Sequence, residues 1–115
     1  MHEYSIVGAL LEQVDEIARE KKARSVQRLE VRIGRLAGVE IELLRTAFET
    51  FRERTICEGA ELAIEEVPAQ WGCGRCGCEV PSGGPLRCPH CGGPARLVAG
   101  EEIFLDRVEM EVAHV

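Results

Sequence analysis

The sequence predicts an α+β fold, with two helices on one face of a three-stranded sheet and a cysteine-rich segment inserted before the last strand. Three observations lead to this prediction. Apolar residues recur at helical spacing in two stretches, they alternate with charged residues in others, and five of the six cysteines fall within residues 70–96. At 115 residues, the chain is long enough for one domain with a small satellite.

Two helices are expected, over residues 5–22 and 39–54. Ser5 is the expected N-cap of the first, because its hydroxyl can accept a hydrogen bond from the first turn. The apolar positions follow three- and four-residue steps in both: Ile6, Val7, Leu10, Leu11, Val14, Ile17 and Ala18, then Ile41, Leu44, Ala47, Phe48 and Phe51.

Three strands are expected between and after these helices. The first alternates Leu29, Val31 and Ile33 with charged residues and ends at Gly34; the second contains Leu62 and Ile64 and is ended by Pro68. The third alternates Val108, Met110 and Val112 with Arg107, Glu109 and Glu111. We expect it to pair with its neighbours, because the insert should be a compact knob whose ends lie close together.

The insert is too poor in apolar residues to fold by hydrophobic burial alone. Residues 70–96 hold seven of the twelve glycines and four of the five prolines, and their large apolar residues are Trp71, Val80 and Leu86. We therefore predict two domains, one formed by residues 1–69 plus 97–115 and the other by residues 70–96.

Four cysteines of the insert have the spacing of a zinc ribbon. Cys73-Gly-Arg-Cys76 and Cys88-Pro-His-Cys91 are two C-x2-C motifs separated by eleven residues, which can surround one ion tetrahedrally. Zinc favours such closed four-thiolate sites, and they are structural. An iron centre of rubredoxin type would use the same ligands. A zinc hydrolase is not expected, because four thiolates leave no open coordination position.

Three further residues have no assigned chemistry. Cys78 is expected to be a spare thiol, although it could exchange with Cys76 at a poorer spacing. His90 is expected on the surface or beside the metal site rather than as a ligand. Cys57 is expected to be a small core residue, since no catalytic group lies near it in the sequence.

The first residues suggest a second metal site. The Met1 amine, the His2 amide nitrogen and the His2 imidazole can close a five- and a six-membered ring on one ion. That planar set of nitrogens suits Ni(II) or Cu(II). The fourth donor stays open among Glu3, water, His90, His114 and a partner protein. Because a chain terminus is usually mobile, we expect moderate affinity. Binding should also release protons, because the amine, the imidazole and the amide nitrogen otherwise hold them.

Charge and hydropathy narrow the class of protein. The net charge of −6 argues against general nucleic-acid binding, although a zinc-ribbon nucleic-acid or protein-interaction module without nickel transfer is the alternative function. No membrane span or secretory signal is expected, because Glu3, Glu12, Asp15 and Glu16 interrupt the early apolar run. A cytoplasmic location is expected, where closely spaced cysteines indicate metal rather than disulfides.

The whole chain resembles the HypA/HybF family of nickel-incorporation metallochaperones. The resemblance rests on "MHEYS", "VRIGRLAGV" leading into "LLRTAFETF", "GAELAIEEVPAQWGC", the two cysteine motifs and a closing acidic strand. It implies nickel binding by His2, with the Met1 amine beside it and Glu3 tuning the site, and structural zinc on Cys73, Cys76, Cys88 and Cys91.

The same resemblance implies that the protein is not an enzyme, and it implies particular partners. These are a HypB-type GTPase and the large-subunit precursor of a [NiFe]-hydrogenase, with urease maturation as a second client that the sequence leaves open. We expect a monomer or a homodimer, in which the last strand could be exchanged between chains.

Overall fold

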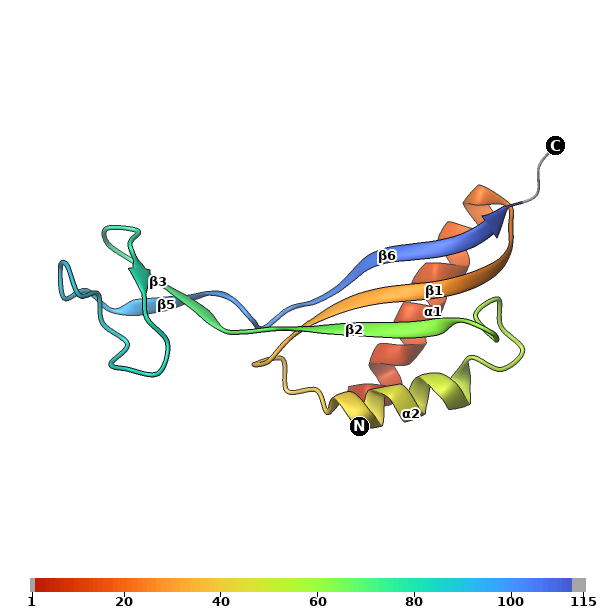
Figure 1. Ribbon diagram of the computed structural model, residues 1–115, viewed down its shortest axis with the longest axis horizontal. Helices are drawn as coiled ribbons and strands as arrows, with labels where there is room; N and C mark the ends of the chain where they lie inside the picture. The colour runs from red at the N-terminus through yellow and green to blue at the C-terminus, as the bar shows by residue number, and fades with distance from the viewer. Residues whose placement is uncertain (1, 113–115) are drawn as a thin grey trace. The chain divides into compact units, whose positions relative to one another are not determined.

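The computed structural model describes residues 2–112, with side chains from residue 3 onward. The elements are α1 (His2–Lys21), β1 (Ala23–Gly34), α2 (Ile41–Phe51), β2 (Glu61–Val67), β3 (Gln70–Cys73), β4 (Glu79–Val80), β5 (Ala95–Ala99) and β6 (Ile103–Val112). The main sheet has the strand order β2-β1-β6, and a small sheet has the order β4-β3-β5 (Figure 1). The predicted fold class is confirmed.

The main sheet is mixed. The ion pairs Arg28–Glu61 and Arg32–Glu65 advance in the same direction along β1 and β2, so these two strands are parallel. On the other side of β1, the contacts Arg32–Asp106 and Arg28–Glu109 run in opposite directions, so β6 is antiparallel. Parallel neighbours need a crossover, and α2 supplies it.

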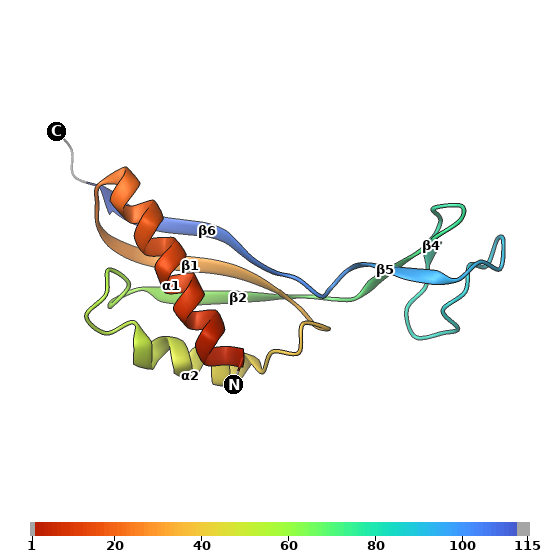
Figure 2. The same cartoon turned by 180° about the vertical axis from the view of Figure 1, so that it is seen from behind.

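One face of the main sheet is buried by the helices. Helix α1 passes behind the strands in Figure 1 and in front of them in the reverse view of Figure 2. The shared core consists of Val7, Leu10, Val14 and Ala18 from α1, Val26, Leu29, Val31 and Ile33 from β1, Leu44, Ala47 and Phe48 from α2, and Leu62 from β2. Full burial of each large apolar side chain contributes about 1.5–3 kcal/mol.

The boundaries of several elements differ from those expected. Helix α1 begins at His2, so the assignment of Ser5 as N-cap is wrong; Ser5 lies exposed within the helix. The buried face of α1 extends one turn further back, to Glu3, whose charge hides it from an apolar pattern. Helix α2 is shorter than residues 39–54, whereas β1 and β6 begin earlier than expected.

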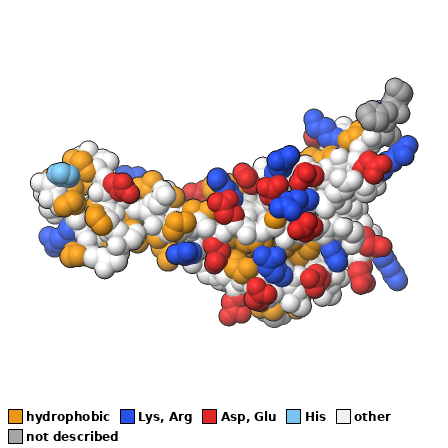
Figure 3. All heavy atoms as spheres, viewed as in Figure 1, with side chains coloured by type: hydrophobic (Ala, Val, Ile, Leu, Met, Phe, Trp, Pro, Cys, Tyr) orange, Lys and Arg blue, Asp and Glu red, His pale blue; other side chains and the backbone are white. Residues whose placement is uncertain are grey.

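The other face of the main sheet is charged. In Figure 3 basic and acidic side chains alternate over the main sheet. Arg28 on the central strand contacts Glu30, Glu61 and Glu109. These groups are partly exposed, so each pair contributes at most about 1 kcal/mol. This face is exposed to solvent, whereas α1 and α2 pack against the other face.

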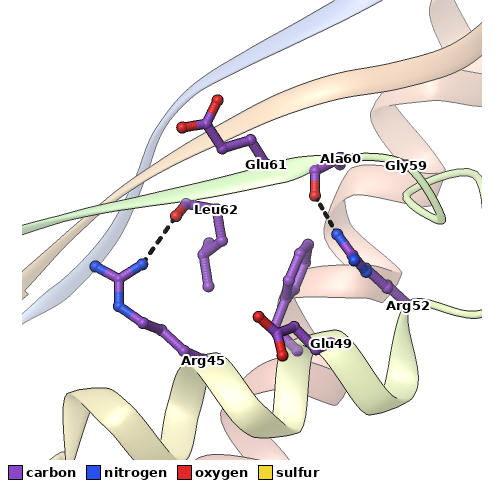
Figure 4. Close-up of a pocket in the computed structure, with 8 residues that line it drawn as sticks. Arg45, Glu49, Arg52, Gly59, Ala60, Glu61 and Leu62 are labelled. Atoms are coloured by element: carbon purple, nitrogen blue, oxygen red, sulfur yellow. Dashed lines mark hydrogen bonds between the residues drawn. The ribbon is translucent and has the colours of Figure 1, made fainter.

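Two arginines, one in α2 and one directly after it, bond to carbonyl oxygens of the edge strand β2 and of the residue before it. Arg45 donates to the Leu62 carbonyl oxygen at 3.1 Å, and Arg52 donates to the Ala60 carbonyl oxygen at 2.6 Å (Figure 4). A pocket of about 420 Å³ remains between them. The guanidinium groups use edge carbonyls that a second strand could otherwise bind, which protects the sheet from edge-to-edge association.

The chain divides into two compact units. The first holds the described residues up to Arg32, Val39–Glu65 and the residues from Phe104 onward; the second holds Ile33–Gly38 and Glu66–Ile103. In the second unit three backbone segments cross in direct contact. A Cβ on Gly34 would lie 2.1 Å from the Gly100 carbonyl carbon, and one on Gly100 would lie 2.7 Å from the Ala69 Cα. Among residues 2–112, no helix is long and apolar enough to cross a membrane.

The crossing predicts a strong effect of one added methyl group. Gly34→Ala should lower the free energy of unfolding by about 1–3 kcal/mol, because the methyl group meets backbone that no rotamer change can move away. Gly8→Ala is the matched control in α1, where nothing lies within 4 Å of an added Cβ. It should stabilise the helix by up to about 1 kcal/mol. Urea unfolding followed by circular dichroism measures both, and equal midpoints would contradict the steric argument.

Candidate metal centres

The first C-x2-C motif forms a tight turn at the end of β3. The backbone N–H groups of Arg75 and Cys76 donate to Cys73 Sγ at 3.3 and 3.4 Å. The N–H of Gly77 donates to the Cys73 carbonyl oxygen at 3.1 Å. Gly77 has φ +77°, a conformation that glycine adopts without steric cost.

The second motif repeats the same turn. The His90 N–H donates to Cys88 Sγ at 3.4 Å, and the Gly92 N–H donates to the Cys88 carbonyl oxygen at 2.9 Å. Gly92 has φ +71°. Each motif is therefore C-x2-C-G in structural terms, because the glycine after the second cysteine closes the turn.

The small sheet and its loops bring the two turns together. Strand β3 pairs with β5 so that Cys73 faces Ala95, and the Cys88 N–H donates to the Gly93 carbonyl oxygen at 2.8 Å. The Sγ atoms of Cys73, Cys76, Cys88 and Cys91 all lie within 4.8 Å of one another. Cys73 and Cys91 are 3.4 Å apart, and Cys76 and Cys88 are 3.5 Å apart.

This arrangement fits a tetrahedral zinc ion. With Zn–S bonds of about 2.3 Å, the sulfurs of a regular tetrahedron are about 3.8 Å apart. The Cys73–Cys91 and Cys76–Cys88 sulfur pairs are about 0.3 to 0.4 Å short of this spacing, at 3.4 and 3.5 Å. Bound zinc would hold the four thiolates and leave no coordination position for water, so the centre stabilises the fold and provides no catalysis.

The turns also favour the thiolate form of the first cysteine in each motif. The backbone N–H groups of Cys76 and Arg75 lower the pKa of the Cys73 thiol to about 6. The Cys91 N–H is the main cause that lowers the pKa of Cys88, and the His90 N–H adds to it against the opposing effect of burial. Thiolates are the form that binds metal, so the folded turns favour the ligand state of Cys73 and Cys88. At Cys76 and Cys91 the backbone N–H groups of Cys78 and Gly93 act in the same direction, but the neighbouring thiols outweigh them and raise the pKa of both.

None of the three residues without assigned chemistry belongs to the group of four sulfurs that could hold a metal ion. Cys78 is half-buried against the cysteine cluster, and its carbonyl oxygen accepts a hydrogen bond from the Cys73 N–H at 2.8 Å. His90 is exposed and contributes its backbone. Cys57 is a core residue, as expected; burial, followed by the charge of Asp15, raises the pKa of its thiol to about 11.

The amino-terminal residues lie in a different environment from the one expected. His2 is the first residue of α1, whereas the sequence predicted that this helix begins at residue 5. Met1, the His2 side chain and His114 lie outside the described part of the structure. Glu3 is 6% exposed, and its Oε2 accepts a hydrogen bond from the Glu40 N–H at 3.2 Å.

Two features of these centres were missed by sequence reasoning. One is the contact between Glu3 and Glu40, which are 37 residues apart. The other is the glycine that closes each cysteine turn at positive φ. The repeated C-x2-C-G pattern could have predicted the second, whereas no local pattern predicts the first.

The zinc centre predicts a sharp contrast between two cysteine variants. Cys88→Ala should lose zinc and the order of residues 70–96, while the helical part largely keeps its fold, because the metal replaces a hydrophobic core there. Cys78→Ser is the matched control and should keep one zinc per chain. Metal analysis and amide NMR spectra measure both. Equal loss of zinc in the two variants, or equal proteolysis of both parts in Cys88→Ala, would contradict the assignment.

Comparisons with known proteins agree with this geometry. The family model described as "Hydrogenase/urease nickel incorporation, metallochaperone, hypA" matches residues 1–110. The hydrogenase maturation factor HypA of Aquifex aeolicus is 42% identical over 114 residues, which cover 97% of this chain and 99% of the relative. The HypA of Shewanella halifaxensis is 43% identical over 115 residues, which cover 98% of this chain and 100% of the relative.

Solved structures share the whole architecture. The solution structure of the Ni metallochaperone HypA from Helicobacter pylori superposes with a TM-score of 0.76 at 29% identity, covering 96% of this chain and 98% of the other. A second solution structure of a HypA protein has a TM-score of 0.82 at 31% identity, with 98% of both chains covered. The chain therefore belongs to the HypA family of hydrogenase and urease nickel-incorporation metallochaperones, which carry metal and are not enzymes.

Proposed function

We propose that this metallochaperone binds its cargo, Ni(II), at the amino terminus through the Met1 amine and His2, with Glu3 tuning the site. The observation that supports this proposal most directly is the family match, which begins at residue 1 and so includes Met1-His2-Glu3. The motif combines a primary amine, a backbone amide and an imidazole within two residues. The other two histidines of the sequence, His90 and His114, have no primary amine within two residues.

The coordination chemistry favours nickel over zinc at this terminus. A deprotonated amide nitrogen between two chelate rings imposes a planar arrangement, which Ni(II) accepts and tetrahedral zinc does not. Binding displaces protons from the amine, the imidazole and the amide, so affinity falls as the pH falls. A site whose ligands can be reprotonated suits a protein that must release its metal.

We assign structural zinc to Cys73, Cys76, Cys88 and Cys91. The domain division into residues 1–69 plus 97–115 and residues 70–96 is part of the same proposal. The zinc assignment is supported by the convergence of the four sulfurs in a segment with a very small apolar core. That core consists of Cys73, Val80 and Cys88, with Trp71, Cys78 and Ala95 packed against them.

The proposed partners follow from the role in hydrogenase maturation. Nickel would be delivered to the large-subunit precursor of a [NiFe]-hydrogenase, together with a HypB-type GTPase, and urease is the alternative client. We place this exchange in the cytoplasm and expect a monomer or a homodimer. Curated relatives such as the Aquifex aeolicus and Wolinella succinogenes proteins are named hydrogenase maturation factors, which favours the hydrogenase as client.

The nickel site predicts a selective effect of His2. His2→Ala should weaken Ni(II) binding by at least about tenfold, because it removes the imidazole and one chelate ring. A peptide tag on the Met1 amine should act in the same way. Zinc content should not change in either protein, and Glu12→Ala, at an exposed position of α1, is the control. Calorimetry with untagged, zinc-loaded protein measures the affinities, and an unchanged nickel affinity in both variants would refute the proposed site.

A further inference from the structure

Glu3 lies where a carboxylate is costly unless it is well partnered. It lies on the same face of α1 as Val7 and Leu10, one turn before Val7 and two turns before Leu10, and only 6% of it is exposed. Burial of a charged group is unfavourable without compensating hydrogen bonds. The burial of Glu3 within the packed face of α1 therefore requires hydrogen-bond partners that offset the loss of water.

Helix α2 supplies one such partner, because the first residue before this helix has no capping bond from a neighbouring side chain. The N-cap residue Glu40 has extended backbone angles, φ −85° and ψ 112°, and makes no side-chain capping bond. In a capping box, an acidic or amide side chain three residues further on accepts the N-cap N–H. Here that residue is Leu43, which has no acceptor. Glu3 Oε2 accepts the Glu40 N–H instead, at 3.2 Å, from a different helix.

A second contact fixes the same turn of α1. The rings of Tyr4 and Phe51 meet edge to face, with centroids 5.3 Å apart and an interplanar angle of 88°. Glu3 therefore holds the residue before α2, while Tyr4 holds the last residue of α2. Two neighbouring side chains, pointing in different directions, attach the first turn of α1 to both ends of α2.

We propose that Glu3 is a positioning residue of the nickel site, and that its carboxylate acts by bonding to the Glu40 N–H rather than by binding nickel. This inference rests on the proposed nickel site at Met1 and His2. His2 is one peptide bond from Glu3, so a fixed Glu3 restricts the backbone on which the planar chelate is built. A more ordered terminus loses less conformational entropy when the metal binds.

Glutamine and alanine at position 3 separate positioning from metal binding. The glutamine carbonyl oxygen can still accept the Glu40 N–H, but a neutral amide is a much poorer nickel ligand than a carboxylate. Glu3→Gln should keep nickel affinity within about threefold of wild type, whereas Glu3→Ala should weaken it by about tenfold. Glu42→Gln is the matched control, because it removes an exposed charge from the first turn of α2 without touching Glu3.

The contact itself is tested without nickel. In zinc-loaded, nickel-free protein, hydrogen exchange of the Glu40 amide should be slow in wild type, Glu3→Gln and Glu42→Gln, and about tenfold faster in Glu3→Ala. Zinc content and circular dichroism show whether each variant is folded. If Glu3→Ala fails to fold, Glu3→Gln still tests the proposal through its nickel affinity.

Three outcomes would overturn the inference. Equal exchange of the Glu40 amide in wild type and a folded Glu3→Ala would show that the contact does not order the start of α2. Loss of nickel affinity in Glu3→Gln with the Glu40 amide still protected would make Glu3 a ligand. Unchanged nickel affinity in His2→Ala would refute the proposed site, while the exchange data would still report the Glu3 contact separately.

Discussion

The insertion of a metal-dependent unit into the main sheet depends on close contact between three backbone segments. The chain leaves the main sheet after β2 and returns before β6, so both passages must cross the end of β1. The crossing is possible because Gly34 and Gly100 have no side chains, and Gly100 adopts φ +111°. Hydrogen bonds from Gly34 to Glu102, from Arg35 to Val67 and from Leu36 to Gly100 close it. Because of this crossing, β6 can pair with β1 despite the long insert.

The two metals of this protein pose opposite physical problems. Zinc must stay, and the structure provides four converging sulfurs, two of which, those of Cys73 and Cys88, accept backbone N–H groups that favour the thiolate. A segment with so little apolar surface gains its stability from those bonds. Nickel must be released, and in the proposed site its donors come from Met1 and from His2, the first residue of α1. Metal affinity there depends on how well that first turn is held, so packing between α1 and α2 can tune affinity without adding a ligand.

Much of the fold followed from local patterns. The amphipathic spacing predicted both helices, the alternation predicted the strands of the main sheet, and Pro68 marked the end of β2. The start of α1 was missed because Ser5 resembles an N-cap and Glu3 does not resemble a buried residue. The parallel pairing of β1 and β2 was not predicted, since alternation within a strand carries no information about its neighbour's direction. The Arg45 and Arg52 contacts to β2 were also outside any local pattern.

The sequence by itself determined which stretches form the helices and strands of the main sheet and which four cysteines can meet at one ion, because both depend on residue spacing over a few positions. The two C-x2-C motifs supply four thiols at the spacing of a zinc ribbon, and an amine followed by histidine supplies the donors of the proposed nickel chelate. Only the tertiary structure decided which distant residues come into contact and which groups form hydrogen bonds with each other. Glu3 and Glu40 meet because two helices pack on one sheet face, and Gly34 meets Gly100 because the chain crosses itself. Such contacts join residues 37 and 66 positions apart, and burial rather than sequence neighbourhood selects them.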